Sequence, residues 1–138
     1  MNQHPKLPLR ITLLLWLVLI LTAWNIVRFA TSLGWRDTLV TYAVRPGPFY
    51  IGLTGAIWTI LGCVLLLGFT RGANWSRVSI LVSGIAYFIW FWIDRLFVQP
   101  LLRANWPFDL LITVVILGFT IAVALDPDNQ NYFLKRDL

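Results

Sequence analysis

The chain has 138 residues, of which 59% are hydrophobic and only 12% charged, with a formal net charge of +5. Soluble domains average about 25% charged residues, and one of this size could not hide so much apolar side chain in a single core. The composition therefore excludes an ordinary soluble protein and predicts an integral membrane protein forming one domain over residues 1–138. The Lys and Arg residues are scattered over the loops without a dense patch, so we expect the lipid bilayer and no nucleic acid as a partner.

Residues for acid–base or metal chemistry are scarce. The chain has no Glu, one His (His4) and one Cys (Cys63), which lies inside an apolar run. A single Cys forms neither an intrachain disulfide nor a multi-cysteine metal site, so we expect Cys63 to be a small buried side chain. We accordingly expect no enzymatic activity, no cofactor and no metal site.

Four apolar segments are long enough to cross a membrane, at about residues 9–33, 49–69, 76–97 and 107–125. Because lipid cannot satisfy backbone polar groups, each segment should be an α-helix. Short connections should make consecutive helices antiparallel. The sequence thus predicts an all-α fold, a four-helix antiparallel transmembrane bundle with short loops.

The first segment follows a short polar stretch, residues 1–10. A signal peptide is the alternative interpretation, disfavoured because the apolar run continues through Trp24 and Asn25 without a small-x-small cleavage site. The uncharged part of the segment, residues 11–27, only just reaches the ~17 residues needed to cross the hydrocarbon. Either the helix ends near Arg28, or Arg28 lies inside the membrane boundary and is paired.

The connection over residues 34–48 begins with Gly34, which suits a helix C-cap, and ends with Pro46 and Pro48, which stop a helix. Four residues between them would share one face of a short helix: Trp35, Leu39, Tyr42 and Ala43. Such a helix would lie in the membrane interface. An irregular loop with aromatic anchors is the alternative.

Small residues recur at helical spacing along the second and third segments and form a predicted helix-packing seam. They are Gly52, Gly55, Ala56, Thr59 and Gly62 on one segment, with Ser79 and Ser83 on the next. Small side chains let two helix backbones approach closely in lipid. Because residues 70–75 allow only a tight turn, we expect a hairpin in which the glycine side of the seam faces the serines. A substrate channel is the alternative interpretation of the glycines.

One side of the third segment carries nearly all of its hydrogen-bonding groups. They recur three or four residues apart: Ser76, Ser79, Ser83, Tyr87, Trp90 and Asp94. Lipid offers a hydroxyl or carboxylate no partner, so this side should face other protein. We expect this helix to be the one against which the others assemble.

The antiparallel arrangement gathers charges at one membrane face. The ends of the first and third segments and the start of the fourth would place Arg28, Asp94, Arg95 and Asp109 at similar depth. We predict an Arg28–Asp94 contact, with Asn25 as a further polar partner one turn below Arg28. Such a cluster would either lock the rim of the bundle or bind a lipid headgroup, quinone or small anion. In the second case the aromatic walls would be Trp24, Tyr87, Trp90, Phe91 and Trp92.

The numbers of Lys and Arg residues on the two sides of the membrane are nearly equal, so they favour one orientation only slightly. With both termini on one side, that side carries Lys6, Arg10, Arg71, Arg77, Lys135 and Arg136, and the other carries Arg28, Arg36, Arg45, Arg95 and Arg103. If Arg28 and Arg95 are neutralised within the protein, both termini are expected in the cytoplasm, with the prokaryotic cytoplasmic membrane as the location.

For function, the sequence favours a non-enzymatic accessory or structural subunit of a larger membrane complex, or a self-associating bundle. The alternative is a small transporter, or a lipid-, quinone- or anion-binding protein that uses the Arg/Asp cluster. A membrane enzyme or proton-relay subunit is least supported, because Asp94 has no His or Glu in the spans as a proton-transfer partner.

Overall fold

A computed structural model describes residues 8–99 and 105–127, which are 89% helical and include no strand. Within them, four helices are long and apolar enough to span a membrane: α1 (Leu9–Gly34), α3 (Pro48–Arg71), α4 (Asn74–Ile93) with its π-helical extension η1 (Asp94–Val98), and α5 (Trp106–Leu125). A short helix, α2 (Arg36–Thr41), lies between α1 and α3. The predicted all-α fold with four apolar helices is confirmed.

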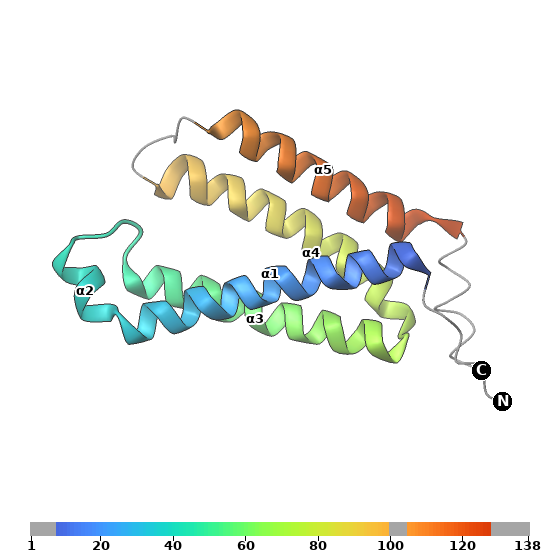
Figure 1. The fold of residues 1–138 in the computed structure, drawn as a ribbon, viewed down its shortest axis with the longest axis horizontal. Helices are drawn as coiled ribbons and strands as arrows, with labels where there is room; N and C mark the ends of the chain where they lie inside the picture. Colours follow the sequence, from blue (N-terminus) through green and yellow to red (C-terminus); the bar gives the residue numbers. More distant parts are fainter. Residues whose placement is uncertain (1–7, 100–104, 128–138) are drawn as a thin grey trace.

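The long helices form two antiparallel pairs, α1 with α3 and α4 with α5 (Figure 1). The pairs meet where α1 begins, α3 turns into α4 and α5 ends, and they diverge toward α2 and η1. We call these the closed end and the open end. The arrangement means that the two pairs share a core at one end only.

Apolar burial holds the closed end together. Seven buried hydrophobic side chains from all four long helices form the core: Ile11, Leu14, Leu65, Phe69, Ile80, Val123 and Ala124. Arg10 forms a salt bridge to Asp126, and Arg77 Nε donates to the Ala124 carbonyl. The tight α3–α4 turn depends on Gly72, whose φ of 66° is left-handed and whose N–H bonds to carbonyls of the last turn of α3.

The predicted glycine seam lies against α1, so the expectation that it faces the serines of α4 is wrong. Its three glycines have the following neighbours: Gly52 lies against Ser32, Gly55 against the backbone of Asn25 and Phe29, and Gly62 against Thr22. The reason is a matching stripe of small polar residues on α1, formed by Thr22, Asn25 and Ser32, which lets the backbones approach. The α3 glycine that does meet α4 is Gly68, beside Trp75 and Ser76 at the turn.

The other seam residues take different positions. Ala56 and Thr59 are half-buried, and the Thr59 hydroxyl donates to the Gly55 carbonyl of its own helix at 2.7 Å. Ser79 and Ser83 are also half-buried. Cys63 is exposed, so the expectation of a buried thiol is wrong. Its neighbour Gly62 faces α1, and one residue further on, a helix has turned by about 100° toward the surroundings.

Helix α1 continues to Gly34, well past Arg28, and so Arg28 lies within the helix. The connection that follows forms the short helix α2, in place of the irregular loop that was the alternative. It has no buried residue. The open end is therefore bounded by α2 on one pair and by η1 on the other.

Candidate functional site

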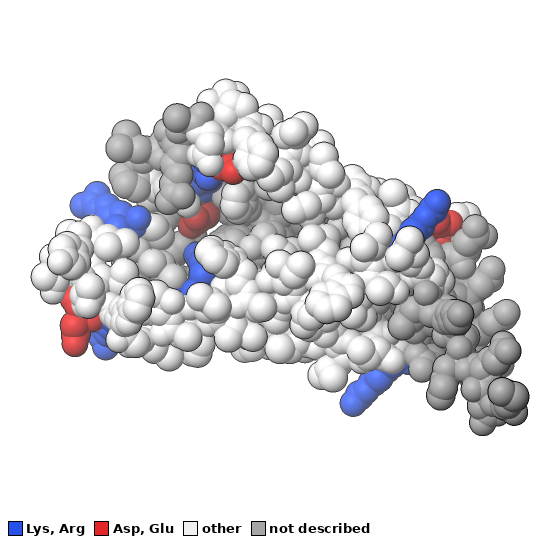
Figure 2. Space-filling view, viewed as in Figure 1, with Lys and Arg blue, Asp and Glu red and all other residues white. Residues whose placement is uncertain are grey.

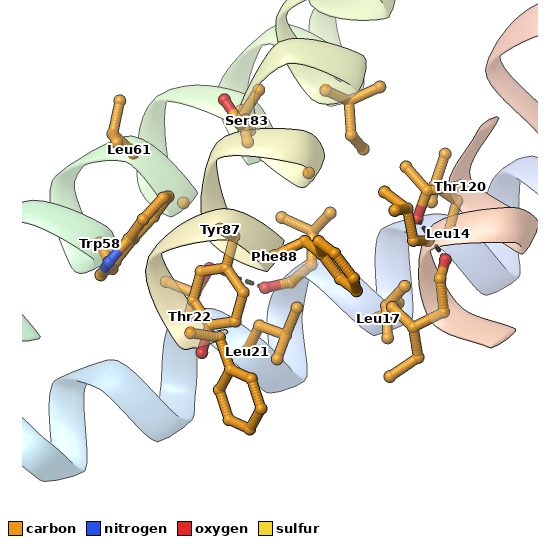
Figure 3. A pocket seen from close by; sticks show the side chains of 18 of the residues that line it. Leu14, Leu17, Leu21, Thr22, Trp58, Leu61, Ser83, Tyr87, Phe88 and Thr120 are labelled. Carbon is orange, nitrogen blue, oxygen red and sulfur yellow. Dashed lines mark hydrogen bonds between the residues drawn. The ribbon is translucent and has the colours of Figure 1, made fainter. Parts of the chain in front are cut away.

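A cavity of about 120 Å³ lies between the two helix pairs. Side chains from all four long helices converge on it, and Figure 3 shows among them Leu14 and Leu21 of α1, Trp58 of α3, Tyr87 of α4 and Thr120 of α5. Most of the lining is aliphatic or aromatic. The polar lining groups are an amide, a phenol and a few hydroxyls: Asn25, Tyr87, Thr22, Ser83, Thr113 and Thr120.

Asn25 is the most buried polar group in this wall. Its side chain is 1% exposed, and Nδ2 donates to the Leu21 carbonyl at 2.8 Å. Oδ1 has no hydrogen-bond partner in the described part of the chain, although the Tyr87 phenol approaches the amide. The cavity wall therefore contains a buried acceptor that the protein leaves unsatisfied.

An aromatic cluster continues from the cavity toward the open end. Trp58 lies edge-on to Tyr87, with ring centroids 4.7 Å apart, and each of these rings is 5.4 Å from Trp90. The Arg28 guanidinium carbon lies 5.2 Å from the Trp90 centroid, a cation–π contact. Arg28 Nη2 also donates to Thr54 Oγ1, at 3.5 Å.

The predicted Arg28–Asp94 ion pair is not formed. The salt bridges of the described residues join Arg10 to Asp126 and Arg95 to Asp109. Arg28 instead contacts Thr54 of α3 and Trp90 of α4. Trp90 precedes Asp94 by about one helical turn. A neutral ring and a hydroxyl thus occupy the place of the expected carboxylate.

Asp94 is buried at the start of the π-helical turn. Its Oδ2 accepts a hydrogen bond from Gln99 Nε2 at 3.1 Å, which the wider turn allows by aligning residues five apart. The Tyr50 phenol of α3 approaches the same carboxylate. Oδ1 is buried without a hydrogen-bond partner among residues 8–99 and 105–127. Asp94 therefore retains an unused acceptor.

Arg95 and Asp109 form the ion pair of the open end. Arg95 Nη2 contacts Asp109 Oδ2, and the same nitrogen donates to Asn105 Oδ1 at 3.4 Å. Their side chains are 7% and 21% exposed. The pair joins η1 to the first turn of α5, where the helix dipole also stabilises a carboxylate. Its role is to hold α4 and α5 together.

Of the four predicted charges, Arg95 and Asp109 thus form an ion pair, whereas Arg28 and Asp94 each contact uncharged groups. Figure 2 shows a hollow between the two helix pairs near the open end, with blue and red atoms on its walls. Tyr87 lines the cavity, and its ring centroid lies 5.4 Å from that of Trp90, the ring that Arg28 contacts. The aromatic cluster therefore lies between the cavity and Arg28, and Asp94 follows Trp90 one helical turn further along the chain.

Sequence reasoning missed several residues of this site. Tyr50, Thr54 and Trp58 are spaced by four along α3, a pattern that would have predicted one polar and aromatic face. Gln99 gave no signal, because its contact with Asp94 needs the π-helical turn. Trp24 was predicted to be part of the aromatic wall of the site, but it is 59% exposed on α1 and does not line the cavity.

Within the described residues, no three side chains of metal-ligating type come together. Comparison of the chain with protein-family models, with curated proteins and with solved structures finds no match.

Proposed function

We propose that this protein is a non-enzymatic membrane protein that holds an amphiphilic molecule between its two helix pairs. The polar head occupies the open end, near Arg28 and Asp94, and the apolar tail occupies the cavity. The observation that carries this proposal is the mostly apolar cavity between the helix pairs, whose wall contains the buried, unsatisfied Asn25 Oδ1. A second buried oxygen without a partner in the described residues, Asp94 Oδ1, lies toward the open end.

The energetic argument concerns those oxygens. A buried acceptor left unsatisfied costs about 1–3 kcal/mol, and nearly all buried polar groups in proteins have a partner. A polar head that donates hydrogen bonds would remove this cost. Apolar cavities of about 150 Å³ bind benzene, so the 120 Å³ cavity is large enough for part of a hydrocarbon chain.

A cavity-filling substitution tests the proposal. Ser83→Phe places a ring in the cavity, whereas Ala86→Phe adds a ring at an exposed position less than one turn away on α4. The wild type and Ala86→Phe should retain an amphiphile through purification in mild detergent, seen by native mass spectrometry and lipid extraction. Ser83→Phe should lose it. Equal retention by both variants, or none by the wild type, contradicts the proposal.

An accessory subunit is the second candidate function. It is favoured by the position of α5, which packs mainly on α4 and leaves large apolar side chains such as Leu111, Val114 and Val115 exposed. A photo-crosslinking residue at Val115 on α5 should then capture one defined membrane partner or a second copy. The same residue at Ile20, exposed on α1, should not. Lipid adducts alone at both positions contradict this candidate.

For location, we propose the prokaryotic cytoplasmic membrane with both termini in the cytoplasm. Support comes from the charges of the open end: Asp109 neutralises Arg95, and Arg28 is half-buried against Trp90. Charges neutralised in this way weigh less in the positive-inside balance, which leaves the terminal side the more basic.

A further inference from the structure

The open end presents two opposite charges that the protein does not pair with each other. Arg28 belongs to the α1–α3 pair, and Asp94 lies at the end of α4. In the described part of the chain, Arg28 has no carboxylate within salt-bridge distance, and Asp94 has no Lys or Arg. Arg95, the residue next to Asp94, is already paired with Asp109. A ligand with both charges could satisfy both residues.

Resting on the function proposed above, we propose that the amphiphile is a membrane phospholipid whose head joins a phosphate to a primary ammonium, as in phosphatidylethanolamine. The phosphate binds Arg28 and the ammonium binds Asp94. The acyl chains run into the cavity and along the groove between the helix pairs. Each part of this assignment follows from a different group of residues.

The phosphate is assigned to Arg28 because a guanidinium offers five donors in a planar fork suited to phosphate. Among residues 8–99 and 105–127, Arg28 makes one hydrogen bond, the long one from Nη2 to Thr54 Oγ1 at 3.5 Å. Trp90 stacks on the guanidinium and restricts its orientation. Most of the N–H groups of Arg28 therefore remain for a ligand, from a side chain already held in place.

The ammonium is assigned to Asp94 because Oδ1 needs a hydrogen-bond donor. The other oxygen is occupied by Gln99, and the buried Asp94 is 6% exposed. A primary ammonium donates hydrogen bonds, whereas the quaternary ammonium of a choline head cannot.

The depth of the site suits a head group. Arg28 precedes the end of α1 at Gly34 by six residues, or about 9 Å of helix at 1.5 Å per residue. Asn25 and Tyr87 follow toward the cavity, so polarity falls step by step from the open end inward. A lipid standing parallel to the helices would meet the charges with its head and the cavity with its chains.

Lipid retention from a defined mixture tests the inference. The purified protein is reconstituted with equal amounts of phosphatidylethanolamine, phosphatidylcholine and phosphatidylglycerol of identical chains, then re-extracted, and the retained lipid is identified by native mass spectrometry. The wild type should retain phosphatidylethanolamine about tenfold over each of the others, the worth of one charge-assisted hydrogen bond.

Substitutions at Asp94 and at Arg28, each with a control on α2, test the two charges separately. Asp94→Asn should abolish the preference over phosphatidylcholine, while Asp37→Asn, an exposed carboxylate on α2, should leave it unchanged. Arg28→Gln should lower retention of all three lipids about tenfold, Arg28→Lys should recover part of it, and Arg36→Gln on α2 should match the wild type. Thermal unfolding of each variant shows whether it is folded.

The outcomes distinguish this inference from the function on which it rests. If the wild type retains all three lipids equally, or prefers phosphatidylglycerol, while Ser83→Phe still abolishes retention, the head-group assignment is overturned and the amphiphile-binding function stands. If Asp94→Asn keeps the full preference, the assignment is likewise overturned. If Ser83→Phe retains lipid as well as Ala86→Phe does, the proposed function itself fails.

Discussion

Gly55 of α3 lies so close to Phe29 of α1 that a Cβ at position 55 would stand 3.0 Å from the Phe29 backbone nitrogen. The carbonyl oxygen of Asn25 would be 3.1 Å away. Backbone atoms cannot move aside as a flexible side chain can. The closeness of α1 and α3, and hence the position of Arg28 above Thr54, therefore depends on a glycine here.

Gly55→Ala should separate α1 from α3 and destabilise the bundle by about 1–3 kcal/mol, the cost of overpacking a close interface. Gly118 of α5 is the matched control, because a Cβ there meets nothing within 4 Å. Gly118→Ala should be neutral or stabilise by up to about 1 kcal/mol through helix propensity. Denaturant titration in detergent micelles measures both, and equal stability of the two variants contradicts the packing described.

The Arg95–Asp109 pair should contribute strongly to the α4–α5 contact. Asp109→Asn leaves the buried Arg95 without its carboxylate and should cost about 3 kcal/mol, the low end for buried pairs because Asp109 is partly exposed. Arg10→Gln breaks a pair whose Arg side chain is 69% exposed and should cost at most about 1 kcal/mol. Unfolding of both variants in the same detergent gives the comparison. If Arg10→Gln lowers the free energy of unfolding more than Asp109→Asn does, the predicted order of the two ion pairs is wrong.

Double-mutant cycles should separate the observed pair from the one expected from sequence. The charge-swapped variant Arg95→Asp/Asp109→Arg should recover about 1.5 kcal/mol or more relative to the sum of its single substitutions. In protein freed of bound lipid, Arg28→Asp/Asp94→Arg should show a coupling below about 0.5 kcal/mol, because these residues contact different partners. Strong coupling between positions 28 and 94 would mean that they form an ion pair after all.

Trp90 should stabilise the fold through the cation–π contact of its ring with Arg28. Trp90→Leu removes the cation–π contact to Arg28 and should cost about 0.5–2 kcal/mol beyond the lost packing. Trp90→Phe keeps an aromatic face and should recover part of that loss. The same pair of substitutions in an Arg28→Gln background provides the control, since the difference between Leu and Phe should shrink there. An unchanged difference is evidence against the contact.

Orientation can be measured because Cys63 is the only cysteine in the sequence. In a Cys63→Ala background, Thr38→Cys on α2 should react with a membrane-impermeant maleimide added to intact cells. Ala73→Cys, in the α3–α4 turn at the closed end, should react only after the cells are opened. The reverse labelling pattern would place the termini outside the cytoplasm.

Most of the candidate site could not be read from the sequence, although its charged members could. The sequence places Arg28, Asp94, Arg95 and Asp109 at one end, because antiparallel spans of known length bring their ends together. Which acid meets which base depends on distances of a few ångströms. Those distances are set by the π-helical turn at Asp94 and by the stacking of Arg28 on Trp90, neither of which leaves a periodic signal.

The glycine seam shows the same division. Its spacing predicted close packing, and the structure has close packing, yet against α1 in place of α4. Small residues at helical spacing indicate that a helix can pack closely against another helix, but they do not identify which one. The complementary stripe of Thr22, Asn25 and Ser32 on α1 is weaker in sequence because larger residues separate its members.

By itself, the sequence determined the fold class and the four apolar segments, since a long run of apolar side chains in lipid must become a helix. Only the tertiary structure decided which helices pair, and that Arg28 and Asp94 contact different partners at the open end. Length and hydrophobicity act along the chain and can be read residue by residue. Pairing depends on the shapes of two surfaces at once, which no single segment contains.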